Sequence, residues 1–387
     1  MSVFLDHAAT TPLRPEARDA WLRATETVGN PSSVHGAGQA ARRLLEDARE
    51  RVATALACDP VEVVFTSGGT EAVNLALKGL WWARAAGADA VVLPDGEHHA
   101  TLDTVRWLAD AERAQVRAVG VDATGMIVPE AFARVLPGAA VATAVAANNE
   151  VGTVNPVADL ASAAAEAGVP LHIDAVGALG HVDLPFASLR GDARGGTGLV
   201  ALSASGHKVG APVGTGALVV SRHAAPTALV HGGGQQRGLR SGTQDVAGAT
   251  AFSVALEAAL HERERENQRL RTLADRLRTG ILALVPGAEQ LGHPSARLAG
   301  NVHVLFPDAV GETLLFLLDQ AGISAATGAA CQAGVAEPSH VVLALGRTAS
   351  EARRVLRFTL GRTSTHGDVD AVLSALPHAY ARAAAAG

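Results

Sequence analysis

Between residues 61 and 221 the sequence alternates short β-branched runs with longer helical patterns, and this alternation constrains the fold more than any other feature. The strand-like runs are 61–67, 89–94, 114–121, 140–148, 169–175, 199–205 and 215–221, and helical patterns occupy 70–87, 99–110 and 156–168. Strands that alternate with helices form βαβ units, in which a parallel sheet is covered on both faces. The sequence therefore predicts an α/β fold with a mostly parallel central sheet.

A second, smaller α/β unit is predicted after a long helical pattern over 248–284, whose densely charged centre indicates a solvent-facing connection. Beyond it lie strand patterns at 300–307 and 353–361 and helical patterns at 311–322, near 338–345 and at the C-terminus. We expect residues 16–259 to form the large domain, and residues 1–15 together with 260–387 to form the small one.

Composition excludes several classes of protein. The 387 residues carry a net charge of −6 and no basic cluster, so the sequence does not indicate a nucleic-acid-binding protein. No signal peptide and no apolar run long enough to span a membrane are visible. The two cysteines, Cys58 and Cys331, are too few for a disulfide framework or a cysteine-based zinc site, so we expect a cytoplasmic protein without a metal.

Lys208 and Asp174 each follow a predicted buried strand. Lys208 lies in the Gly-rich stretch SGHKVGAPVGTG, where it is either a surface lysine or the residue that forms a Schiff base with a carbonyl cofactor. Asp174 is either a structural ion-pair partner or the carboxylate that keeps the ring nitrogen of pyridoxal phosphate (PLP) protonated.

Other segments also carry polar or reactive groups that could belong to a site. TSGGTEAVNL (66–75) either cradles a phosphate or caps a helix through Ser67 or Thr70. His98 and His99 point in different directions, which disfavours a shared metal; one of them is either a ring-stacking or acid/base group or a helix cap. The Gly- and Arg-rich loop 231–243 is typical of functional loops. Arg357 in a strand pattern would need an anion such as a carboxylate. Cys331, in TGAACQAGV, is either a packed residue or a reactive thiol.

Taken together, these stretches resemble the cysteine desulfurases of the NifS/IscS type, which are fold-type I PLP enzymes. The resemblance covers nearly the whole chain, in order, through these motifs: FLDHAATTP, GNPSSVHGAG, FTSGGTEAVNLALKG, EHHATLD, ANNEVGTVNPV, HIDA, SGHKVGAPVGTGAL, GGGQQRGLRSGT, GAACQAGVAEPSHVVLALG and RFTLGR.

The resemblance implies a role for each matching residue. Lys208 would hold PLP and later move the substrate Cα proton, Asp174 would pair the pyridine nitrogen, and His98 would stack on the ring. The phosphate would be bound by Gly69, Thr70, Ser205 and His207, and by Thr243 from the second subunit of a homodimer. Asn149, beside the cofactor, and Arg357 would orient the carboxylate of L-cysteine. The Cys331 thiolate would take the substrate sulfur as a persulfide for an acceptor protein, in iron–sulfur cluster assembly, tRNA thiolation or a dedicated sulfur pathway.

Gly177 is the sharpest departure from this family, whose members usually carry Gln there to hydrogen-bond the phenolic oxygen of PLP. Val73 and the Ser-poor loop around Cys331 are smaller departures. They leave open a related enzyme, such as a selenocysteine lyase, another C–S lyase or a class-V aminotransferase, and a non-catalytic protein of the same fold.

Overall fold

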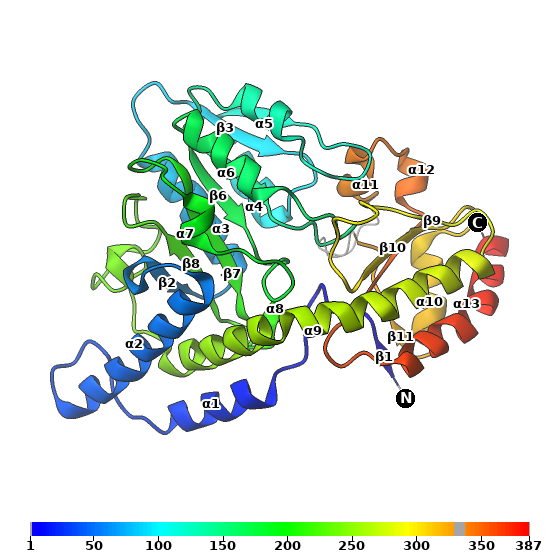
Figure 1. The fold of residues 1–387 in the computed structure, drawn as a ribbon, viewed down its shortest axis with the longest axis horizontal. Coiled ribbons are helices and arrows are strands. Elements are labelled where there is room, and N and C mark those ends of the chain that lie inside the picture. Colours follow the sequence, from blue (N-terminus) through cyan, green and yellow to red (C-terminus); the bar gives the residue numbers. More distant parts are fainter. Residues whose placement is uncertain (1, 329–336, 387) are drawn as a thin grey trace.

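A computed structural model describes residues 2–328 and 337–386 of the chain. Its central feature is a seven-stranded sheet with the strand order β2-β8-β7-β6-β5-β3-β4 (Figure 1). The strands are β2 (Val63–Thr66), β3 (Ala90–Pro94), β4 (Gln115–Val119), β5 (Val141–Val145), β6 (Pro170–Asp174), β7 (Gly198–Ser205) and β8 (Gly216–Val220).

Within this sheet β8 pairs antiparallel with β7 and with β2, while the remaining pairings are parallel. The prediction of a mostly parallel sheet is confirmed. The reversal at β8 has a simple cause: only the short helix α8 (Gly206–Val209) and a turn separate β7 from β8, which is too little chain for a parallel crossover.

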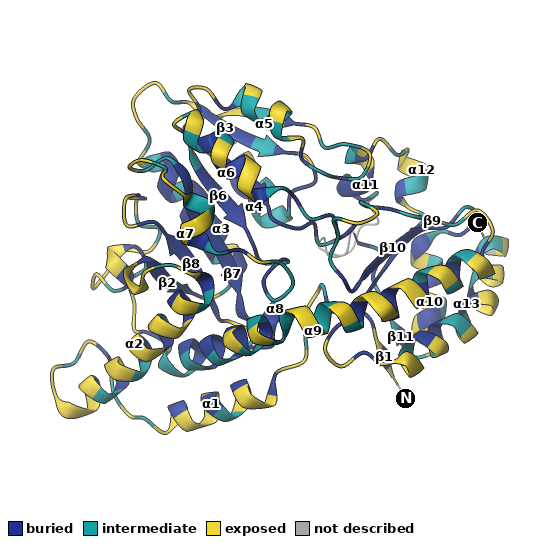
Figure 2. Ribbon diagram, in the orientation of Figure 1, coloured by how far each residue is buried: buried dark blue, intermediate teal, exposed yellow. Residues whose placement is uncertain are grey.

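Apolar side chains leave the sheet on both faces. Along β3, Val92 belongs to one apolar cluster and its neighbour Val91 to another, and Phe65 and Val64 of β2 divide in the same way. Successive residues of a strand point to opposite faces, so both faces are covered. Buried strands lie between partly exposed helices in Figure 2. The sheet helices are α3 (Gly69–Trp82), α4 (His99–Glu112), α5 (Pro129–Val135), α6 (Val157–Glu166) and α7 (Phe186–Arg190).

The N-terminal helices and some element bounds were not predicted from the sequence. Helices α1 (Pro15–Thr25) and α2 (Gly36–Leu56) pack against the first half of the long helix α9 (Val246–Leu284). The helical pattern predicted over 70–87 ends five residues early, at Trp82, and Gly87 then adopts a φ of 84°. The loop 231–243 contains the short 3-10 helix η2 (Gln236–Gly238), and another, η1 (Pro60–Glu62), precedes β2.

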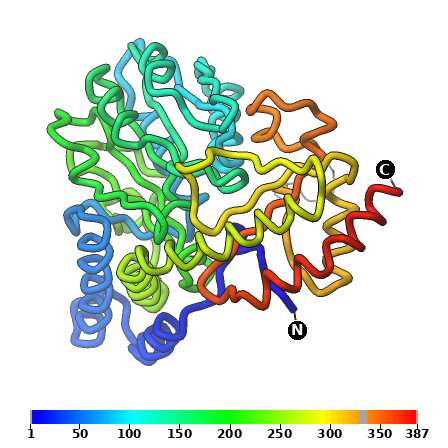
Figure 3. The backbone as a smooth tube through the Cα atoms, turned by 45° about the vertical axis from the view of Figure 1, so that its right-hand side comes forward, coloured from blue at the N-terminus to red at the C-terminus, as the bar shows by residue number. Residues whose placement is uncertain are grey.

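Helix α9 connects two apolar cores, as the long helical pattern predicted. Phe252 and Leu256 belong to the core of the large sheet, whereas Leu270 and Leu277 belong to a separate core. The charged stretch between them contributes no residue to either core. Figure 3 shows α9 running from the first unit into the second.

The second core is built around a three-stranded antiparallel sheet in the order β12-β10-β9. Its elements are β9 (Glu289–Gln290), β10 (Asn301–Leu305), α10 (Gly311–Gln320), α11 (His340–Ala344), α12 (Ala349–Ala352), β12 (Val355–Thr359) and α13 (His366–Ala386). The N-terminal strand β1 (Val3–Phe4) pairs with β11 (Ile323–Ser324) beside it. We retain the division at residues 15/16 and 259/260 as a proposal.

The described residues contain neither a membrane-spanning helix nor a cluster of metal-binding side chains. None of the described helices is long and apolar enough to cross a membrane. Over residues 2–328 and 337–386, His, Cys, Asp and Glu side chains do not gather in groups of three that a metal ion could use.

Candidate active site

Lys208 lies just beyond the C-terminal end of β7, where the N-terminal segment of the chain crosses it. Its Nζ donates hydrogen bonds to the carbonyl oxygens of Ala8 and Ala9, the latter at 2.9 Å. The hydroxyl of Thr11 donates to the carbonyl of His207 at 2.8 Å. Residues almost 200 positions apart therefore form one wall of the site.

Asp174 ends β6 in the neighbouring strand position, opposite Ser203 of β7. The carboxylate is 3% exposed, and its Oδ1 accepts a hydrogen bond from the backbone N–H of Val176 at 3.0 Å. Burial raises the pKa of Asp174 to about 6, while the Val176 hydrogen bond and the charge of Lys208 act in the opposite direction. At neutral pH Asp174 is therefore an anion close to the Lys208 cation.

His98 caps the N-terminus of α4. Its Nδ1 accepts the backbone N–H of Ala100 at 3.1 Å. Burial and, second, the charge of Lys208 lower the pKa of His98 to about 4. The ring is therefore neutral at physiological pH, and it lines a pocket together with Thr70. This cap fixes the orientation of the ring beside Thr70.

The turn between β2 and α3 has the shape of an anion cradle. Gly68 has a φ of 151°, and a Cβ on Gly69 would lie 2.5 Å from Val176 Cγ2, so a side chain has no room there. Ser205 lies next to this turn: a Cβ on Gly69 would lie 3.4 Å from that of Ser205. The first-turn N–H groups of a helix lack intrahelical partners and favour an anion.

His207 is held next to the same wall of the site, since its Nδ1 lies 3.2 Å from the hydroxyl of Thr10. Burial, followed by the charge of Lys208, lowers the pKa of His207 to about 4. It is therefore a neutral hydrogen-bonding group there.

Arg357 projects from β12 and is 4% exposed. Its Nη2 forms an ion pair with Asp6 at 2.7 Å, and its Nη1 donates to the carbonyl oxygen of Asn149 at 2.9 Å. Its buried Nε has no hydrogen-bond partner among the residues that the structure describes. The guanidinium is thus fixed in orientation, while its Nε–H has no protein acceptor among the described residues.

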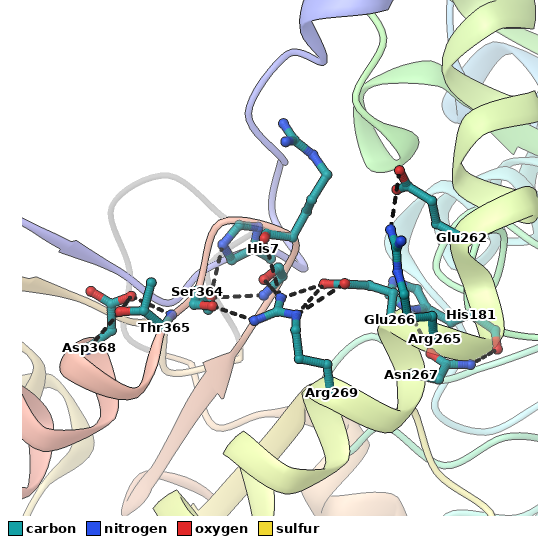
Figure 4. A network of polar contacts seen from close by, with 12 residues as sticks. His7, His181, Glu262, Arg265, Glu266, Asn267, Arg269, Ser364, Thr365 and Asp368 are labelled. Atoms are coloured by element: carbon teal, nitrogen blue, oxygen red, sulfur yellow. Dashed lines mark hydrogen bonds and ion pairs between the residues drawn. The ribbon is translucent and has the colours of Figure 1, made fainter.

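A cavity extends from Lys208 and Asn149 past Gly177 toward α9, where His7 and His181 line it. Burial lowers the pKa of His7 to about 4, so this ring is neutral. Figure 4 shows the polar network around Glu266, which also lines the cavity: Arg269 of α9 pairs with Glu266 and donates to the carbonyl of Ser364, at 2.6 Å. The space opened by Gly177 is therefore continuous with the site.

The structure does not bring every predicted residue together. Thr243 is exposed, away from the cavity that Lys208 lines. Cys331 lies outside the described residues. Cys58 packs against the core of the large sheet, and burial raises the pKa of its thiol to about 12, with Glu62 adding to this. Asp6, Glu97 and Glu150 had no role assigned from the sequence, although each lies in a motif that carries the resemblance.

Comparisons with known proteins agree with this geometry. The sequence profile described as "Aminotransferase class-V" matches residues 3–372. The chain is 46% identical to an "IscS-like cysteine desulfurase" of Mycobacterium tuberculosis, over 98% of this chain and 96% of that protein.

The chain belongs to the class-V aminotransferase family, among its cysteine desulfurases.

Further members of the family support the assignment. The "Cysteine desulfurase IscS" of Methanosarcina thermophila is 39% identical over 97% of this chain and 91% of its own length. A solved "NifS-like protein" superimposes with a TM-score of 0.90 at 30% identity, over 99% of this chain and 100% of that one. The predicted fold type and family are therefore confirmed.

Membership of this family implies PLP, and the residues present fit that group. The cradle formed by Gly68 and Gly69 excludes side chains and suits a phosphate. Asp174 is a buried anion at a strand end, where a pyridinium nitrogen can pair with it. Lys208 is the amine beside both His98 and Asp174, because its charge acts on the pKa of each.

Proposed function

We infer that the protein is a PLP-dependent cysteine desulfurase, which converts L-cysteine to L-alanine and leaves the sulfur as a persulfide on Cys331. One observation carries this inference: Lys208 and Asn149 line the same cavity, and the carbonyl of Asn149 accepts a hydrogen bond from the buried Arg357. An amine for the cofactor therefore faces the same cavity as the residue that the guanidinium contacts.

Only two lysines occur in the sequence, Lys78 and Lys208, so the choice of a residue that links PLP is narrow. Lys78 lines a pocket together with Thr70 and His98, but its Nζ lies over the ring of Trp107, 4.4 Å from the ring centroid. Lys208 lies beside Asp174, whose carboxylate would pair the cofactor nitrogen. These positions support Lys208 as the linking residue.

The other proposed cofactor contacts come from the surrounding loops. His98 would stack on the ring as a neutral imidazole. The phosphate would be held by the following residues: Gly69, Thr70, Ser205, His207 and Thr243 of the partner subunit. The exposed position of Thr243 in one chain supports its contribution across a homodimer interface. When bound, PLP accepts the electrons released when the substrate Cα proton is removed.

Arg357 would bind the substrate carboxylate through its unpaired Nε, held by its contacts with Asp6 and Asn149. The freed amine of Lys208 would take the Cα proton. The Cys331 thiolate would then attack the substrate sulfur. A sulfur–sulfur bond forms, the carbon–sulfur bond breaks with its electron pair left on carbon, and that carbon takes up a proton. L-alanine leaves, and the terminal sulfur of the Cys331 persulfide passes to an acceptor protein.

The test is to incubate the purified protein with PLP and L-cysteine and to measure L-alanine together with the persulfide on Cys331. We expect Lys208→Ala to lose the visible absorbance of bound PLP and both products, while Lys78→Ala, the matched lysine control, retains them. Cys331→Ala should bind PLP but form no persulfide, and Cys58→Ala should behave like the wild type. Alanine formation at the wild-type rate by Cys331→Ala would contradict the proposed role of the thiol.

A further inference from the structure

Glu150 is a buried carboxylate to which the cysteine desulfurase reaction as described above gives no task. It lies in the loop after β5, directly after Asn149, and is 3% exposed. Its Oε2 accepts a hydrogen bond from the hydroxyl of Ser339 at 2.6 Å. The same oxygen would lie 2.7 Å from a Cβ placed on Gly328. One carboxylate therefore contacts two residues that are 11 positions apart in the sequence.

Gly328 and Ser339, which we call the stem residues, stand on either side of Cys331. Gly328 has a φ of 89°, a conformation that L side chains rarely adopt, and the Glu150 carboxylate fills the space of a Cβ. The hydroxyl of Ser339 also accepts the backbone N–H of Val342 at 3.1 Å and so caps α11. Glu150 therefore contacts the stem residue on each side of Cys331.

Residues next to the stem residues are bonded to the site: one contacts Arg357, and the other contacts the residue before His98. Ala326 exchanges two backbone hydrogen bonds with Arg357, at 2.7 and 3.1 Å. His340 lies with its Nε2 2.9 Å from the carbonyl oxygen of Glu97, the residue before His98. The chain therefore leaves the site next to the carboxylate-binding arginine and returns next to the ring-stacking histidine.

The loop that bears Glu150 is held to the same elements. The side-chain amide of Asn148 accepts the backbone N–H of Glu150 at 2.9 Å and donates to the carbonyl of Gly96 at 2.9 Å. Asn301 donates to the carbonyl oxygen of Glu150, also at 2.9 Å. These contacts fix the backbone of Glu150. Its carboxylate therefore has a defined position, and both stem residues pack against it.

We propose that Glu150 is a positioning residue for sulfur transfer: it holds Gly328 and Ser339 at a set place relative to Arg357 and Asn149, so that Cys331 starts its attack from a defined origin. This inference rests on the proposed function. Small displacements of a reacting group cost large factors in rate, and Cys331 is only three residues beyond Gly328. Losing the Ser339 contact removes a hydrogen bond to a carboxylate, so we expect a fall of about tenfold or more in the rate of persulfide formation.

The experiment compares Glu150→Ala, Glu150→Gln and Ser339→Ala in the full-length enzyme loaded with PLP. The matched control is Glu166→Ala, because Glu166 accepts a hydrogen bond from Ser162 at 3.2 Å on the exposed side of α6. Three quantities are measured: the change in the visible spectrum on addition of L-cysteine, the single-turnover rate of persulfide formation on Cys331, and backbone hydrogen exchange at 326–328 and 339–342.

We expect Glu150→Ala to bind L-cysteine with nearly wild-type affinity, to form persulfide slowly and to exchange faster at both stems. Glu150→Gln, whose amide oxygen still accepts from Ser339, should recover most of the rate, and Glu166→Ala should change none of the three quantities. The inference is overturned if Glu150→Ala forms persulfide at the wild-type rate, or if L-cysteine binding falls as much as persulfide formation. A wild type that binds L-cysteine but never forms persulfide would instead overturn the proposed function.

Discussion

Glu97 is a fully buried carboxyl group whose replacement by Gln should change how stability depends on pH. It is 0% exposed; its Oε1 accepts the backbone N–H of Val145 at 2.7 Å, and its Oε2 has no partner among the described residues. Burial and, second, the negative charge of Asp174 raise the pKa of Glu97 from 4.5 to about 8. Val145 pairs with Asp174 across β5 and β6, which explains the proximity.

The sign follows from proton binding. Between pH 4.5 and 8 Glu97 is protonated in the folded protein and ionised in the unfolded chain, so stability falls as the pH rises through this window. A full pKa unit corresponds to about 1.4 kcal/mol, so raising the pH from about 5.5 to about 7 costs the wild type about 2 kcal/mol through this group. Glu97→Gln removes this cost because Gln does not titrate.

The measurement is the free energy of unfolding of the wild type and of Glu97→Gln by denaturant titration at several pH values in this range. The difference between the two cancels the contributions of titrating groups that do not act on Glu97. We expect the free energy of unfolding of Glu97→Gln to increase by about 2 kcal/mol relative to that of the wild type as the pH rises from about 5.5 to about 7. A difference that does not change with pH would refute the reasoning.

Glu71→Gln is the control of opposite sign. Burial alone would raise the pKa of Glu71, but hydrogen bonds from Ser67 and the charge of Arg240 outweigh it and lower the pKa below 4.5. The stability that Glu71 contributes is therefore present above its unfolded pKa and is lost as the pH falls through its lower folded pKa. As the pH rises, the free energy of unfolding of the wild type should increase relative to that of Glu71→Gln, whereas it should decrease relative to that of Glu97→Gln.

Three further substitutions test the site itself. Arg357→Lys puts all its donors on one nitrogen and loses the planar guanidinium that reaches Asp6 and Asn149 from separate nitrogens, so we expect KM for L-cysteine to rise about tenfold or more in steady-state assays, with a smaller change in kcat. Gly177→Gln places its Cβ 3.3 Å from a backbone oxygen, a contact that a small shift relieves; its amide would donate to the phenolic oxygen of PLP and tighten PLP binding by about tenfold, measured by spectroscopic titration. Gly216→Ala would bring a Cβ within 2.7 Å of the Gly68 backbone, so it should weaken PLP retention during dialysis while leaving Arg357-dependent substrate recognition intact.

The sequence predicted the class of fold because its evidence is local. Alternation of strand and helix patterns fixes a parallel sheet covered on both faces, and residues at strand ends, such as Lys208 and Asp174, then meet at one edge. The long charged helix between two apolar stretches likewise predicted a connection between two cores, because its apolar residues occur only toward its ends. Helices α1 and α2 were not predicted.

Tertiary structure alone decided which distant groups share a contact. Arg357 and Asp6 are 351 positions apart, and the pattern around Arg357 predicted only that some anion was needed. The direction of β8 followed from the short turn after Lys208. The raised pKa of Glu97 depends on the neighbouring strand that carries Asp174, and the place of Glu150 depends on Gly328 and Ser339. A sequence pattern indicates which face of its own strand or helix a residue occupies. The burial of a carboxyl group and the charges around it depend on segments that are distant in the sequence and come together only in the folded chain.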